Sequence, residues 1–104
     1  MLQSDNVIVV DIDGTICTIE QDYSMCKLMP GCLEALKLLR DKGYKIYLQT
    51  GRHINHLEIT LKWLKDNSVL YDHIVFGKPP AKYYIDDRAI SFVSWDILIK
   101  NIVL

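Results

Sequence analysis

A short run of β-branched residues that ends in two carboxylates limits the possible folds of this 104-residue chain more than any other feature. Residues 7–10 read Val-Ile-Val-Val, and Asp11-Ile12-Asp13-Gly14 follows directly. Such a continuous apolar run is typical of a strand that is buried on both faces in a parallel sheet. Where the strand ends and the chain turns, both carboxylates converge on one point. Because two carboxylates so close repel each other unless a proton or a cation lies between them, the pair predicts a magnesium site.

Strand-like and helix-like segments alternate along the rest of the chain. Further strands are expected over 44–49, 73–76 and 83–85, and helices over 31–42, from about 54 to 64, and within 91–104. Residues 16–28 have no clear period, so we expect a loop or flap close to the two carboxylates. The alternation predicts one domain over residues 1–104, a three-layer α/β arrangement with a mostly parallel sheet.

Charge and cysteine content exclude several classes of protein. The formal net charge of −1 lacks the basic excess of a nucleic-acid-binding protein. The sequence shows neither a secretory signal nor an apolar run long enough to cross a bilayer, so no membrane partner is expected. Cys17, Cys26 and Cys32 are odd in number and lack paired spacing, which argues against disulfides or a zinc knuckle. We therefore expect reduced thiols in a cytoplasmic protein.

Polar residues follow each of the four expected strands. Asp11, Thr50, Lys78 and Asp86 come directly or shortly after them. Right-handed crossovers place the carboxyl ends of parallel strands at one edge of a sheet, so we expect these four residues to meet there. A lone Asp-x-Asp-Gly is as often an ordinary turn as a site, and the convergence is the stronger signal.

The converging groups are suited to phosphoryl transfer. Asp11 is placed to attack phosphorus and form an aspartyl phosphate, which water then hydrolyses. Asp13 is the candidate acid and base, which protonates the leaving oxygen and later activates water. Mg²⁺ held by Asp11, the main-chain carbonyl of Asp13 and Asp86 would neutralise phosphate charge.

Three further groups are candidates for binding the phosphoryl oxygens. The Thr50 hydroxyl and the Gly51 amide lie near the expected start of a helix, where anions are favoured. Lys78 adds a point charge that could bond both the phosphoryl oxygens and Asp11. Arg52 lies near the same edge, and it is as plausible a phosphate contact as an ordinary exposed side chain.

In this order, the four clusters resemble the motifs of the haloacid dehalogenase superfamily. The first motif is matched by residues 11–15, the second by Thr50, the third by Lys78 and the fourth by Asp86-Asp87. The resemblance implies a Rossmann-like fold, dependence on magnesium, and metal binding by Asp86 with support from Asp87. It also implies phosphate esters as substrates, because true dehalogenases of the superfamily lack the second aspartate of the first motif, which is Asp13 here.

Four segments look like the small capsule-biosynthesis phosphatases of that superfamily: residues 13–17, 50–52, 77–79 and 84–89. The segments in which the superfamily inserts cap domains are too short here to hold one. We therefore expect an open, magnesium-dependent phosphatase site for a small phosphorylated metabolite such as a sugar phosphate. Residues 16–28 or a second copy of the chain are candidate covers. The alternative is a non-catalytic or receiver-like regulatory module of the same fold.

Overall fold

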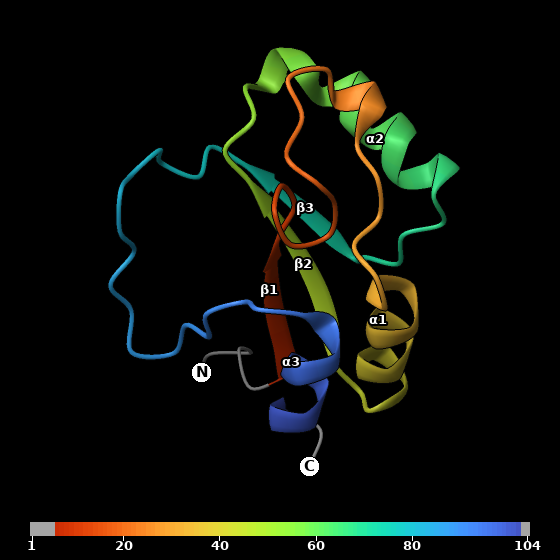
Figure 1. Ribbon diagram of the computed structural model, residues 1–104, viewed down its shortest axis with the longest axis vertical. Coiled ribbons are helices and arrows are strands. Elements are labelled where there is room, and N and C mark those ends of the chain that lie inside the picture. Colours follow the sequence, from red (N-terminus) through yellow and green to blue (C-terminus); the bar gives the residue numbers. More distant parts are fainter. Residues whose placement is uncertain (1–5, 103–104) are drawn as a thin grey trace.

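The computed structural model describes residues 6–102 and shows a three-stranded parallel sheet with helices packed against it (Figure 1). The strands are β1 (Val7–Asp11), β2 (Lys45–Thr50) and β3 (His73–Phe76), in the order β1-β2-β3. The helices are α1 (Cys32–Asp41), α2 (Leu57–Asp66) and α3 (Trp95–Ile102), with short 3-10 turns η2 (Tyr23–Met25) and η3 (Ile54–His56). The predicted α/β class with a parallel sheet is confirmed.

The strand register brings the carboxyl ends of the three strands to one edge of the sheet. Asp11 at the end of β1 lies opposite Gln49, and Thr50 at the end of β2 lies opposite Phe76 of β3. The segments that follow these strands, which carry Asp13, Gly51 and Lys78, therefore leave the sheet close together.

A single apolar core lies between the sheet and the helices. Its buried members from the sheet are Val10, Ile46 and Leu48, and those from the helices include Leu36, Leu39, Leu64 and Trp95. Trp95 is only 1% exposed, and its indole N–H donates to the Thr15 carbonyl at 2.8 Å. Ser94 caps α3 by accepting from the Ile97 N–H at 3.2 Å. Residues 103 and 104 of the expected helix lie outside the described part of the chain.

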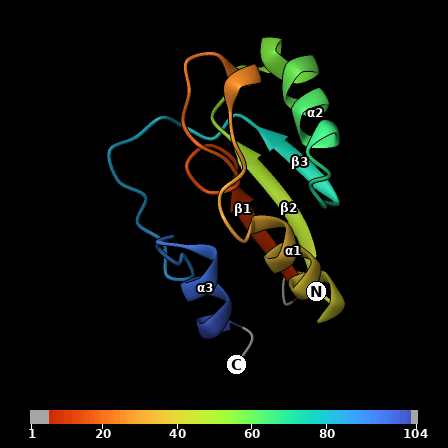
Figure 2. The same ribbon diagram turned by 45° about the vertical axis from the view of Figure 1, so that its right-hand side comes forward.

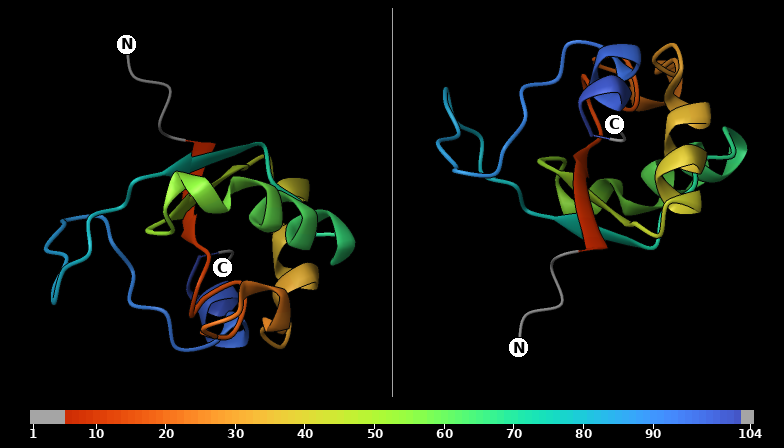
Figure 3. Two further views of the ribbon diagram at one scale, coloured as in Figure 1. Left: turned by 90° about the horizontal axis from the view of Figure 1, so that it is seen from above. Right: turned by 90° about the horizontal axis from the view of Figure 1, so that it is seen from below.

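The opposite face of the sheet is open within residues 6–102. Val9 is 57% exposed and Val75 is 52% exposed, and Figure 3 shows the three helices on the other side of the strands. The expectation that residues 7–10 are buried on both faces is therefore wrong. The reason is that residues 77–102 do not return over this face, so the structure describes one of the two helical layers that a three-layer arrangement requires.

Residues 77–94 form a long loop that extends away from the sheet on the side of β1 (Figure 2). Tyr83, Tyr84 and Ile85 are 73%, 51% and 99% exposed, so the strand expected over 83–85 is wrong in this arrangement. A strand requires a partner for its backbone groups, and this segment has none among residues 6–102. Among the described residues, no strand pairs with the outer edge of β1.

Helix α2 packs against the core through Thr60, Trp63 and Leu64, which are buried. Ile54 in the preceding 3-10 turn η3 is 54% exposed, and Leu57 at the start of the helix is 36% exposed. No helix within residues 6–102 has the length and apolar character that a membrane span needs.

Candidate active site

The carboxyl edge of the sheet carries a solvent-open cavity of about 290 Å³. Five of the predicted site residues line it: Asp11, Asp13, Gly51, Arg52 and Lys78. Rings from Tyr23, Pro80 and Tyr84 complete the wall. Residues from three of the four polar clusters therefore lie together, as expected for the carboxyl ends of parallel strands.

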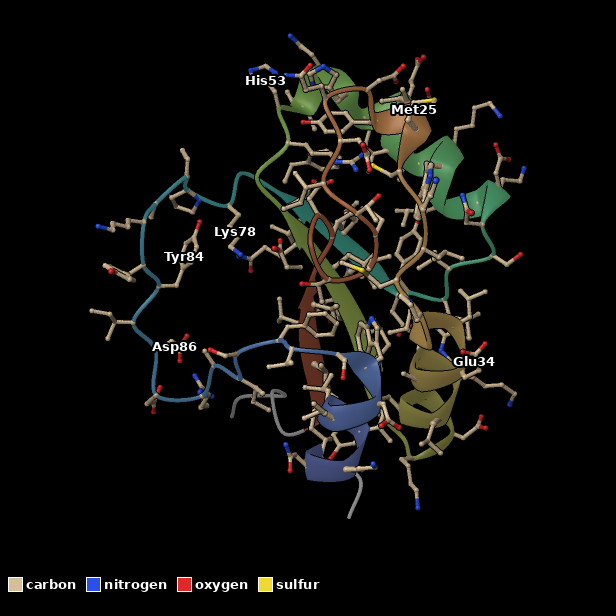
Figure 4. The ribbon with its side chains drawn as sticks, viewed as in Figure 1. Met25, Glu34, His53, Lys78, Tyr84 and Asp86 are labelled. Atoms are coloured by element: carbon tan, nitrogen blue, oxygen red, sulfur yellow. The ribbon has the colours of Figure 1, made fainter. Side chains whose placement is uncertain are left out.

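Asp11 and Lys78 form an ion pair at the floor of the cavity. The Lys78 Nζ lies 3.4 Å from the Asp11 Oδ2, and the two side chains are 20% and 35% exposed. Partial burial raises the pKa of Asp11 above its ordinary value, although the Lys78 ammonium opposes the shift. The same ammonium lies 4.3 Å from the centroid of the Tyr84 ring. Figure 4 shows Lys78 reaching inward from the start of the loop.

Asp13 is held by the guanidinium of Arg52 in a two-point contact. Arg52 Nε donates to the Asp13 Oδ2 at 2.9 Å, and Arg52 Nη2 donates to the Oδ1 at 2.7 Å. The Arg52 side chain is 1% exposed, and that of Asp13 is 25% exposed. Parallel charge-assisted hydrogen bonds of this kind fix the orientation of a carboxylate as well as its position.

The remaining donors of Arg52 are also used inside the protein. Nη1 donates to the Thr60 hydroxyl at 3.0 Å, Nη2 lies 3.6 Å from the Cys26 sulfur, and the Tyr23 ring centroid lies 3.7 Å from Cζ. Arg52 therefore holds Asp13 in one orientation; it also lines the cavity, and the phosphate contact considered from the sequence stays a prediction. The sequence did not indicate Tyr23 or Thr60 as site residues. For Thr60, the one available signal was a polar hydroxyl among the apolar residues of a helix. Tyr23 lies in a loop without a regular pattern, so its position could not be inferred from spacing.

Thr50 and Gly51 support the wall between β2 and Lys78. Thr50 is fully buried, and its hydroxyl accepts from the Arg52 N–H at 3.0 Å. Its carbonyl accepts from the Lys78 N–H at 3.0 Å, which fixes the start of the loop beside β2. A Cβ at position 51 would approach the Lys78 carbonyl to 3.2 Å, so glycine permits this close contact. Thr50 lies beneath the cavity and is not part of its lining.

Asp86 and Asp87 lie outside the site in this structure. Both are exposed on the loop of residues 77–94, and Figure 4 shows Asp86 well away from Lys78. The Asp86 carboxylate instead accepts from the Arg88 N–H at 2.8 Å, as in an isolated turn. The expected meeting of all four clusters is therefore corrected to three, because the segment that carries the fourth is not paired with the sheet.

A different group of potential metal ligands does come together. Asp13, Cys17 and Cys26 place one ligand atom each within 4.8 Å of the others. Cys17, Cys26 and Cys32 are buried free thiols, in agreement with the expectation that they form no disulfides with one another.

Comparison with known proteins shows which proteins the chain is similar to. Residues 8–76 match the family described as haloacid dehalogenase-like hydrolase. An Oceanobacillus iheyensis protein named "putative nucleotidase" is 32% identical over 79 residues, a match that covers 64% of this chain and 42% of the relative. The chain thus spans less than half of that relative.

Two solved structures share the fold. A Vibrio cholerae protein superposes with a TM-score of 0.72 at 30% identity, with 82% of each chain covered. A chain of the Pnkp1/Rnl/Hen1 complex superposes with a TM-score of 0.61 at 20% identity, over 93% of this chain and 34% of its own. The latter similarity concerns the fold alone.

Proposed function

From the premise that this chain belongs to the haloacid dehalogenase-like hydrolase family, we propose that it hydrolyses phosphate monoesters, with Asp11 as the nucleophile. Family membership indicates a hydrolase. The observation that carries the proposal is the pairing of Asp11 with Lys78 at 3.4 Å in an open cavity that Asp13 also lines. An ammonium beside a nucleophilic carboxylate is placed to bind phosphoryl oxygens and to offset their charge during the attack.

The proposed reaction has two steps, each with a defined fate for the proton. Asp13 first takes up a proton from solvent; the Asp11 carboxylate then attacks phosphorus, and the ester oxygen leaves with that proton. Asp13 then takes a proton from water, which attacks the aspartyl phosphate, releases phosphate and restores Asp11. The contact with Arg52 leaves part of the Asp13 carboxylate available, because its two oxygens offer about four lone-pair sites. Its 25% exposed side chain also lines the cavity.

The substrate that we propose is a small phosphorylated metabolite. The cavity of about 290 Å³ is near the lower limit for ligand sites, which favours a compact leaving group. A sugar phosphate is the class that the sequence resemblance implies, and a nucleotide is the class that the name of the Oceanobacillus relative indicates. A cytoplasmic location and a second copy covering the open cavity remain proposals from the sequence.

Magnesium is the cofactor that the sequence predicts, and only part of the predicted ligand set fits it here. The Asp11 carboxylate lines the cavity, and the main-chain carbonyl of Asp13 is the second predicted ligand; oxygen ligands of this kind suit Mg²⁺. Asp86 and Asp87 do not reach these residues, so all four do not fit a single ion in this arrangement. The steps described above depend on the chain's own residues alone.

We propose that Asp86 joins the metal site when residues 83–85 add to the free edge of β1. Asp86→Asn is then expected to raise the Mg²⁺ concentration for half-maximal turnover at least about tenfold, because an oxygen ligand is weakened. Asp96→Asn, which changes an exposed carboxylate on α3, is the matched control. An unchanged magnesium requirement in Asp86→Asn would show that Asp86 takes no part.

The phosphatase proposal is tested by measuring phosphate released from sugar phosphates and nucleoside monophosphates in the presence of Mg²⁺. Lys78→Ala is expected to lower kcat/KM by roughly 10²–10³-fold, because a preorganised charge is lost from the transition state. Lys82→Ala removes an exposed lysine from the same loop and should leave turnover unchanged. If the unmodified protein releases no phosphate from any of these esters, the proposal is wrong.

A further inference from the structure

Asp13, Cys17 and Cys26 form a preorganised cluster beside the catalytic cavity. Their ligand atoms lie within 4.8 Å of one another, and Cys17 and Cys26 are 0% and 7% exposed. Backbone pairing fixes this arrangement: Cys17 bridges to Asp13 on one side and to Leu28 on the other, and the Thr18 N–H donates to the Lys27 carbonyl at 2.9 Å. The cluster is therefore part of the folded framework.

This cluster already surrounds a positively charged group. Arg52 Nη2 lies 2.7 Å from the Asp13 Oδ1, 3.6 Å from the Cys26 sulfur and 4.0 Å from the Cys17 sulfur. One carboxylate and two sulfurs thus point at a common cation position.

Binding of a divalent metal in place of the two thiol protons leaves the net charge of the cluster unchanged. The ion brings two positive charges, and the two protons that leave for solvent remove two. The summed charge of Asp13 and Arg52 is the same before and after binding.

We propose that Asp13, Cys17 and Cys26 bind a soft divalent metal, Zn²⁺ or Cd²⁺, and that the metal inhibits the enzyme by taking Asp13 from Arg52. Two sulfurs and one oxygen select such ions over Mg²⁺. Metal–sulfur bonds of about 2.3 Å at a tetrahedral ion place the two sulfurs about 4 Å apart. The ligand atoms of the cluster already lie within 4.8 Å of one another, so small side-chain rotations suffice. Two S–H bonds break, two metal–sulfur bonds form, and two protons leave for solvent.

The inhibitory part of the inference rests on the proposed function. Asp13 must be free to give and take protons in both steps of hydrolysis, and a carboxylate bound to a metal is a poor base. Because the guanidinium is rigid and planar, Arg52 leaves Asp13 by turning as a whole, and the Thr60 hydroxyl that Nη1 reaches at 3.0 Å is a partner outside the metal cluster.

Binding is tested first with Cd²⁺ alone, by the ultraviolet absorbance of cadmium–thiolate bonds. We expect one equivalent to bind, two protons to be released into weak buffer, and Cys26→Ser to lower the affinity at least about tenfold. Cys32→Ser is the matched control, because Cys32 is equally buried in α1 but lies outside the cluster. Loss of the absorbance in Cys32→Ser, or its persistence in Cys26→Ser, would overturn the assignment.

A second measurement uses only the unmodified protein, so it does not depend on whether a variant folds. Cd²⁺ should slow alkylation of Cys17 and Cys26, but not of Cys32, when the modified peptides are quantified by mass spectrometry. Equal rates with and without Cd²⁺ would contradict the site. Turnover that persists when the cluster is saturated with Cd²⁺ would refute the inhibition. Absence of turnover without Cd²⁺ would instead refute the phosphatase proposal, and the binding test would still be valid.

Discussion

Asp11→Asn is expected to abolish phosphate release, with kcat reduced by at least about 10⁴-fold. The amide preserves the shape of the side chain at the end of β1 but removes the anionic oxygen that attacks phosphorus. It also removes the charge that Lys78 faces at 3.4 Å. Release of inorganic phosphate from a sugar phosphate and from a nucleoside monophosphate is the measurement.

The control for this variant is Asp41→Asn, which changes an exposed carboxylate paired with Lys37 at the end of α1. It should retain full turnover. Undiminished activity in Asp11→Asn would remove this residue from the reaction. Phosphorylated Asp11 that accumulates in the unmodified protein, with no phosphate released, would instead favour the receiver-like alternative.

Local sequence patterns predicted the elements that position Asp11 and Lys78. The β-branched run before Asp11 predicts β1, and the strand expected over 73–76, which leads to Lys78, is confirmed as β3. The general geometry of parallel sheets then brings the ends of β1, β2 and β3 together. Neither step requires knowledge of a particular long-range contact, which is why both succeeded.

The incorrect and missing predictions concern long-range partners. Tyr83–Ile85 has the composition of a strand, but a strand also needs a free edge to pair with, and the local sequence does not encode whether that pairing forms. The protein contacts of Arg52 are among the features that the sequence did not predict. Its actual partners, Asp13, Cys26 and Thr60, lie 39, 26 and 8 residues away. Their choice depends on tertiary packing.

Arg52→Met is expected to lower the free energy of unfolding by about 3 kcal/mol, because it leaves Asp13 without its buried partner. The estimate is at the lower end of the usual range because the Asp13 side chain keeps 25% exposure. Arg40→Met is the matched control: Arg40 donates to Asp72 at 3.0 Å, but its side chain is 37% exposed, so its loss should cost less than about 1 kcal/mol. Denaturant unfolding compares the two variants, and equal losses would contradict a stabilising role for the Asp13–Arg52 pair.

A second substitution at position 52 tests whether Arg52 positions Asp13 for proton transfer, through the choice of leaving group. An alkoxide released from a sugar phosphate needs a proton from Asp13, whereas the stable anion released from p-nitrophenyl phosphate does not. If Arg52 orients the acid, the more conservative Arg52→Lys, which keeps the charge but loses the two-point contact, should lower kcat for the sugar phosphate far more than for the aryl phosphate. A purely structural role would lower both rates by the same factor, since it would reduce the amount of folded enzyme without changing what each folded molecule does.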